Sequence, residues 1–159
     1  MKKLLAVLLS VLMLLSFAAC GQKDTATTAK TAQTATETAQ TKAVAKTGLW
    51  KDALYLEDTS IGTGKKEVKV TVQAEDQSIV FTLHTDLDTL ADALLEAKIV
   101  EGDDTEFGLY IKTVNGILAD YDVDQSFWSL CQNGEMMMTG ASSTPVAGGE
   151  AFELIYTKG

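Results

Sequence analysis

Alternating apolar and polar residues predict most of the strands of this chain. Residues 67–75 (EVKVTVQAE) alternate valines with polar side chains, which is typical of a half-buried strand. Residues 78–84 (SIVFTLH) follow a short polar turn and predict the returning strand of a hairpin. Further strands are predicted over 109–114, 127–132 and 151–157. The first two of these end at Asn-Gly pairs, which favour tight turns.

A helical spacing of apolar residues interrupts this β pattern. The apolar positions are Leu87, Leu90, Ala91, Leu94 and Leu95. They predict one apolar face of a helix of about three turns, and Thr85 with Asp88 has the spacing of a capping box at its start. Residues 53–57 are a further candidate for an edge strand. The order of elements predicts an α+β fold, a β-grasp-like roll with one helix packed across a mixed or antiparallel sheet.

The N-terminus has the pattern of an export signal. Lys2 and Lys3 precede an apolar run over residues 4–17, which is shorter than the roughly 20 residues that a membrane-spanning helix needs. Small residues follow and lead to Cys20. A basic start, a short apolar middle and small residues before the cleavage point predict a secretory signal peptide over residues 1–19.

The small residues before Cys20 also resemble the lipobox of bacterial lipoproteins, although Phe17 stands where that family most often has Leu. The resemblance implies a Cys20 that carries lipid such as palmitate, and a protein anchored on the extracytoplasmic face of the cell membrane. The alternative is plain secretion with a free Cys20. A lipidated Cys20 cannot pair with Cys131, which is then either a packing residue or a reactive thiol.

Composition divides the exported part in two. Residues 22–47 hold 16 alanines or threonines in 26 positions and lack aromatic residues, Leu and Ile. Such a segment cannot bury enough apolar surface to offset the entropy of ordering it, so residues 20–47 are predicted to be the lipidated cysteine and a disordered linker. Helix formation by the alanines is the competing interpretation, and the threonines disfavour it. Residues 48–159 then form one domain.

Charge excludes some classes of partner. The formal net charge is −9, and removal of residues 1–19 would take away two lysines and no acids, which leaves 11 lysines against 22 acids and a charge of −11. All 13 basic residues are lysines, so the chain has no arginine fork for gripping phosphate. A surface this acidic repels nucleic acid and anionic lipid headgroups.

No catalytic constellation is visible. His84 is the only histidine, and no nucleophile with a neighbouring base and an orienting group can be assembled around it, so we expect no enzyme. Residues 62–66 (GTGKK) lack the spacing of a phosphate-binding loop and read as a turn.

An acidic run has part of the pattern of a calcium loop. The alternating acids are Asp120, Asp122 and Asp124. A calcium loop would continue with Gly at its sixth position and Glu at its twelfth, where this chain has Gln125 and Cys131. A solvated acidic loop is therefore the favoured interpretation, and we predict no metal site.

The stretch FWSLCQNGEMMM is the strongest candidate for recognition. Phe127 and Trp128 are neighbours on a predicted strand, so their side chains point to opposite faces and one of them should stay partly exposed. The alternative is that residues 139–150 cover the second face. Met136 directly follows the Asn133-Gly134 turn, and methionines form adaptable apolar surfaces.

Several motifs in order resemble the transcobalamin-like C-terminal domain, a domain of otherwise unknown function in bacterial surface lipoproteins. They are residues 90–94 (LADAL), residues 110–116 (YIKTVNG), Phe127-Trp128 with Asn133-Gly134, and a closing Phe152 and Tyr156. The resemblance covers nearly all of residues 48–158. In animal cobalamin carriers the related domain is a small β-rich cap over a corrinoid held mainly by a helical barrel, which these 159 residues do not contain.

The resemblance implies a ligand-binding face at Phe127, Trp128, Asn133 and Gly134, to which the residue pattern adds Met136. It favours a packing role for Cys131, because other members have an aromatic or apolar residue there. The first hypothesis is a lipid-anchored extracytoplasmic binding module for a small apolar-faced ligand, with a corrinoid such as cobalamin as the candidate, acting in uptake or presenting it to a membrane transporter. Cobalamin would then be a ligand and not a cofactor. The alternative is a structural or adhesive cell-surface module that binds a protein partner.

Overall fold

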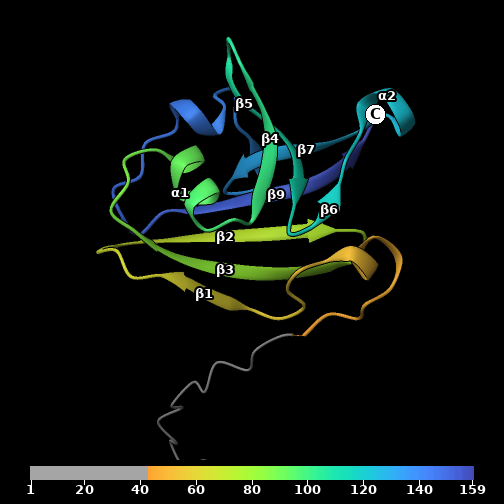
Figure 1. Cartoon of the computed structure of the whole chain (residues 1–159), viewed down its shortest axis with the longest axis horizontal. Helices are drawn as coiled ribbons and strands as arrows, with labels where there is room; N and C mark the ends of the chain where they lie inside the picture. The colour runs from red at the N-terminus through yellow and green to blue at the C-terminus, as the bar shows by residue number, and fades with distance from the viewer. Residues whose placement is uncertain (1–42) are drawn as a thin grey trace, which may run out of the picture. The chain divides into compact units, whose positions relative to one another are not determined.

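Two β-sheets share one hydrophobic core in residues 43–159, the part of the chain that the computed structural model describes (Figure 1). The predicted signal peptide over 1–19, Cys20 and the linker as far as residue 42 lie outside the described residues. No helix within residues 43–159 is long and apolar enough to cross a membrane.

The larger sheet is mixed and has six strands in the order β1-β3-β2-β9-β7-β8. Strands β1 and β3 pair in parallel, as do β2 and β9, and the other neighbours pair antiparallel. The strands are β1 (Thr59–Gly62), β2 (Lys66–Ala74), β3 (Gln77–Thr85), β7 (Ser126–Gln132), β8 (Glu135–Met136) and β9 (Ala151–Lys158).

The smaller sheet is antiparallel and has three strands in the order β4-β5-β6. These strands are β4 (Val100–Thr105), β5 (Gly108–Val114) and β6 (Ile117–Leu118). The helices are α1 (Leu90–Glu96), α2 (Tyr121–Asp124) and the 3-10 helices η1 (Gly48–Asp52) and η2 (Ala141–Ser143). Helix α1 contacts β3, β4 and η2, so it lies between the two sheets and the loop that follows β8.

The core forms where alternation buries one face of the central strands. Val68, Val70 and Val72 of β2 are fully buried, and Val70 lies opposite Phe81 of β3. Trp50 of η1 closes one end of this layer, and its indole N–H donates to the carbonyl of Ala74 over 2.9 Å. Burial of these apolar side chains is the main favourable contribution to folding.

The α+β prediction is confirmed. All five strands predicted from alternation are present, with ends that differ from the prediction by no more than one residue. The helix is shorter than predicted. It begins at Leu90, and its cap is Thr89, whose hydroxyl accepts from the backbone N–H of Asp92 over 3.2 Å. The prediction of a capping box at Thr85 is therefore wrong. Leu87 lies outside the helix and is partly exposed.

The edge of the larger sheet also differs from the prediction. Residues 53–57 do not form the edge strand, which is β1 instead. Glu57 makes an isolated antiparallel bridge with Ala43. The backbone N–H of Val44 donates to the carbonyl of Leu56 over 2.7 Å, and Val44 packs against the core. Residues 43–47, which were predicted to be part of the linker, thus contact the domain.

Asn115 ties the smaller sheet to the segment before β1. It is fully buried in the turn after β5 and has φ of 52°, a left-handed conformation that Asn tolerates better than most residues. Its side-chain amide donates to the carbonyl of Tyr55 and accepts from the Tyr55 N–H, both over 2.9 Å. Its backbone N–H donates to the carbonyl of Ile99 over 2.7 Å.

Replacement of Asn115 should therefore cost much of the stability of the domain. We expect Asn115→Ala to lower the free energy of unfolding by about 2–4 kcal/mol, because both Tyr55 backbone groups lose a buried partner and Ala disfavours this φ. Asn133→Ala is the matched control, since Asn133 occupies the same type of Asn-Gly turn at φ 56° but is exposed. Urea unfolding of both variants would measure how much free energy of unfolding each one loses. Equal losses would contradict the importance of the buried amide.

Candidate functional site

The hairpin of β4 and β5 projects from the domain (Figure 1). Thr105 pairs with Gly108, which leaves Glu106 and Phe107 as the two turn residues. The Thr105 hydroxyl donates to the Gly108 carbonyl over 2.7 Å and accepts from the Phe107 N–H over 3.2 Å. These two bonds fix the backbone of the turn, so the side chains at the tip are presented in a defined direction.

A second contact braces one side of the hairpin. The hydroxyl of Ser142 in η2 accepts from the backbone N–H of Leu109 over 2.9 Å. Gly108 allows this approach, because a Cβ at that position would lie 2.7 Å from the Ser142 Cβ and because its φ is 98°. The tip beyond this contact remains open to solvent.

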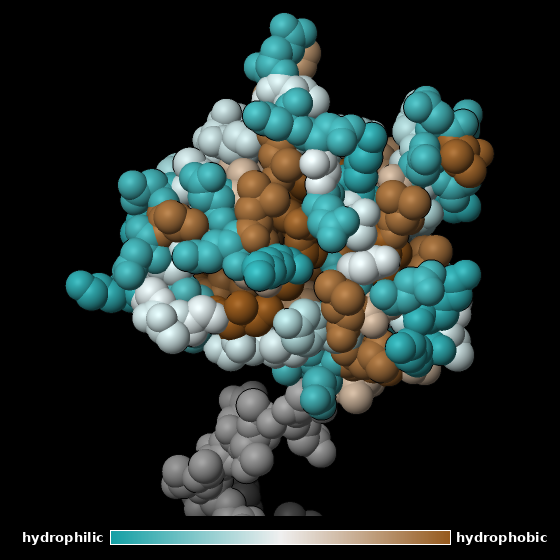
Figure 2. Space-filling model, viewed as in Figure 1, coloured by the Kyte–Doolittle hydropathy of each residue, from teal (hydrophilic) through white to brown (hydrophobic). Residues whose placement is uncertain are grey.

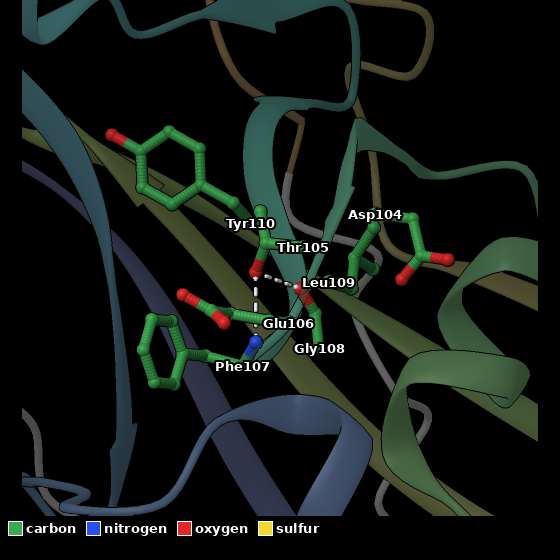
Figure 3. Close-up of a pocket in the computed structure, with 7 residues that line it drawn as sticks. All are labelled: Asp104, Thr105, Glu106, Phe107, Gly108, Leu109 and Tyr110. Atoms are coloured by element: carbon green, nitrogen blue, oxygen red, sulfur yellow. Dashed lines mark hydrogen bonds between the residues drawn. The ribbon is translucent and has the colours of Figure 1, made fainter.

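An open hollow of about 730 Å³ lies along this hairpin, lined by residues 104–110. Phe107 is 86% exposed and Tyr110 is 44% exposed. Figure 3 shows both rings on the same side of the hairpin, with the carboxylate of Glu106 between them and Asp104 pointing to the other side. A Phe side chain that is largely in solvent is unusual, because Phe normally packs inside, and Tyr110 of β5 adds a partly exposed ring beside it. Exposed apolar surface of this kind marks binding sites.

The acids of the hairpin differ in their partners. Asp103 forms an ion pair with Lys112 over 2.5 Å, and the hydrogen bond and charge of Asp103 raise the pKa of the Lys112 ammonium. Within residues 43–159, no ion pair reaches Glu106 or Asp104. The charge of Asp103 is thus compensated locally, whereas those of Glu106 and Asp104 are not.

The residues predicted to bind ligand do not gather on one surface. Trp128 is 8% exposed and faces the core, where its indole N–H donates to the Ile117 carbonyl over 3.3 Å. Phe127 lies on the opposite face of β7, half-buried beside Tyr121 at a ring-centre distance of 6.5 Å. Met136 pairs with Cys131 and is exposed.

The Asn133-Gly134 turn is exposed, and the Gly134 N–H donates to Glu153 over 3.1 Å. A shallow hollow near Gln132 is lined by Met137, Thr139 and Thr144, so the loop after β8 lies on the core side of β7, the side of Trp128. The face with Phe127 is not the one that this loop covers. The hairpin at Phe107 and Tyr110 was not predicted from the sequence. The available signal was a single Phe between Glu106 and Gly108 in an acidic stretch.

The other residues considered for a chemical role take part in structural contacts. Cys131 is buried and unpaired, and burial together with the charge of Glu153 raises the pKa of its thiol, which disfavours the reactive thiolate. The Asp120 side chain accepts from the Asp122 N–H at the start of α2. Among residues 43–159, no group of three or more His, Cys, Asp or Glu side chains is placed to hold a metal ion.

Comparisons with known proteins support the fold. Residues 88–158 match the family model described as a domain of unknown function (DUF4430). A Ruminococcus gnavus ATCC 29149 protein, provisionally described as metal-binding, is 38% identical; the match covers 60% of this chain and 99% of that one, with a TM-score of 0.56. Haptocorrin in complex with Cbi is 21% identical, with 58% and 25% covered and a TM-score of 0.50. No curated protein matches.

The two matches support different conclusions. The haptocorrin match is too low in identity to show more than the fold, and it spans only a quarter of the haptocorrin chain. The Ruminococcus gnavus protein is matched over almost its whole length.

A cluster at Asp124 holds the start of β7 against the end of β9. The Asp124 carboxylate accepts from the Ser126 hydroxyl and lies 3.0 Å from the Lys158 ammonium. The Ser126 hydroxyl, followed by Lys158, lowers the pKa of Asp124 from 3.8 to about 2. A depressed pKa in the folded state stabilises the fold above the unfolded value and stops doing so as pH falls through the folded value.

Asp124 should therefore contribute stability that disappears in acid. We expect wild type to be more stable than Asp124→Asn above pH 3.8, and the difference to vanish as pH falls to about 2. Thermal unfolding of both proteins across this range would measure it, with Asp122→Asn as the control on the exposed side of α2. A difference between wild type and Asp124→Asn that stays constant down to the lowest pH would contradict this role.

Proposed function

The chain belongs to the same family as the Ruminococcus gnavus protein, and from that premise we propose that it is a binding module without chemistry of its own. The observation that carries the proposal is the β4–β5 hairpin, where Phe107 and Tyr110 hold two rings in solvent over one open hollow. The ligand is a small molecule with an apolar face.

The size and openness of the hollow suit one face of a flat ligand. A volume of about 730 Å³ is within the usual range of small-molecule sites. All of its lining comes from one hairpin, so the protein would cover only one side of the ligand. An exposed second side would be available to another protein, which fits the presentation of a ligand to a membrane transporter.

A corrinoid is the ligand that we propose. Haptocorrin was solved with Cbi, and its fold is similar to this domain. The Ruminococcus gnavus protein is provisionally described as metal-binding, whereas residues 43–159 of this chain contain no group of three or more His, Cys, Asp or Glu side chains placed to hold an ion. A corrinoid carries its own cobalt inside the ring, so its binding needs no metal ligands from the protein.

Attachment to the extracytoplasmic face of the membrane through Cys20 completes this proposal. The support is the basic and apolar N-terminus and the small residues before Cys20. The linker would separate the domain from the membrane by a distance on the order of 30 Å.

A structural or adhesive surface module that binds a protein is the second candidate. Leu118 of β6 and Tyr121 and Val123 of α2 are all more than half exposed. Figure 2 shows hydrophobic residues among hydrophilic ones in the region of α2. These side chains lie outside the hollow, so variants at the two places separate the two functions.

The hairpin rings should control ligand affinity. We expect Phe107→Ala and Tyr110→Ala each to weaken binding of cobinamide or cobalamin by about tenfold, because each removes a ring from the contact. Isothermal titration of the chain from Gly21 onward would measure this, with Val123→Ala as an exposed control that should bind like wild type. Absence of heat at millimolar ligand would exclude a corrinoid as the ligand. Equal losses of affinity in all three variants would exclude the hairpin as the site.

The two cysteines give a direct test of the anchor. Cys20→Ala should release the protein from the membrane fraction and abolish incorporation of a fatty-acid label, whereas Cys131→Ala should change neither, because Cys131 is buried in the domain. Fractionation and labelling of cells that express each variant would measure both. Recovery of the unprocessed chain in the cytosol, with its leader attached, would overturn the anchor.

A further inference from the structure

Glu106 occupies an unusual position between the two exposed rings. It is one of the two turn residues, and Figure 3 shows its carboxylate on the same side of the hairpin as Phe107 and Tyr110. It is exposed, and no ion pair in residues 43–159 compensates its charge. The neighbouring acid Asp103 has Lys112 as its partner, so Glu106 is the uncompensated charge on the ring side.

Aromatic rings and a carboxylate attract the same kind of group. The face of an aromatic ring carries partial negative charge and attracts cations, and a carboxylate does so more strongly. A neutral ligand would gain no charge attraction from Glu106, and an anion would be repelled. The formal net charge of −9 acts in the same direction at longer range.

We propose that the hollow selects a ligand with positive charge beside its apolar face, and that Glu106 is the residue that imposes this preference. The proposal rests on the proposed binding function and specifies the ligand class for the same site. Phe107 and Tyr110 supply contact area that is similar for charged and neutral ligands, whereas Glu106 supplies the discrimination.

Cobinamide offers two probes that share one ring. Cobalt(III) with one cyanide and one water gives the molecule one positive charge, and a second cyanide makes it neutral. Titration of the chain from Gly21 onward with each form, in mildly alkaline buffer and with potassium chloride matched to the added cyanide, compares the two. We expect the cationic form to bind about two- to fivefold more tightly, as an exposed charge pair allows, and the preference to shrink at high salt.

Glu106→Gln should remove most of this preference, whereas Asp104→Asn should keep it. The two changes remove the same charge from the same hairpin, but Asp104 points to the other side of it. Equal affinity of wild type for both forms would overturn the proposal, as would a preference that survives in Glu106→Gln.

A second pair of probes decides the proposal if neither form of cobinamide binds. Choline and 3,3-dimethylbutan-1-ol have the same shape and differ in charge. Their titration into isotope-labelled protein, followed by NMR, should shift the amide signals of residues 104–110 with choline only, and not with choline in Glu106→Gln. A response to choline without cobinamide binding would reject the corrinoid and keep the charge preference. No response to choline, or equal responses to both probes, would overturn the preference.

Discussion

One buried amide controls where the projecting hairpin begins. Asn115 closes the turn at the base of β5, and it exchanges both side-chain hydrogen bonds with the backbone of Tyr55. Its own carbonyl accepts from the Leu54 N–H over 3.0 Å, and its N–H reaches Ile99 before β4. Residues 54–55, Ile99 and the turn after β5 therefore meet at one residue, through both its side chain and its backbone. Because buried polar groups are costly without partners, this arrangement is strongly preferred over any other register.

The base of the hairpin is fixed in this way, while its tip has little to bury. Val100 and Val114 at the base are in the core, whereas the rest of β4 is exposed. Beyond the base the hairpin depends on strand pairing, on the Thr105 hydroxyl and on the Ser142 contact. A fixed base with an open tip is a suitable way to present side chains to a ligand, since the backbone of the turn need not be ordered again when the ligand arrives.

Three of the five strands predicted from alternation have one clearly buried face, whereas β5 buries only Val114 and β7 buries residues on both faces. In β2, β3 and β9 every second residue enters the core, so the period of two was visible in the sequence. Strand β4 (VEGDDT) was not predicted, because only Val100 is buried and pairing with β5 holds the remainder. Periodicity reports burial, and a strand with a single buried side chain leaves no such signal.

Strand geometry also explains why the predicted site residues on β7 differ from the exposed residues of the hairpin. Phe127 and Trp128 were predicted to bind ligand because they are adjacent aromatic residues. Neighbouring residues of a strand point to opposite faces, however, and Trp128 is buried in the core. Phe107 and Tyr110 share one side because the turn and the register of β4 with β5 place them there. Gly108 at the start of β5 and Asn115 just after its end lie against Ser142 and Tyr55, which come from segments distant in sequence. Hydrogen-deuterium exchange with and without cationic cobinamide tests the central claim most directly. The account predicts slower exchange confined to amides of the β4–β5 hairpin, and protection at the β7–β8 turn, with an unchanged hairpin, would contradict it.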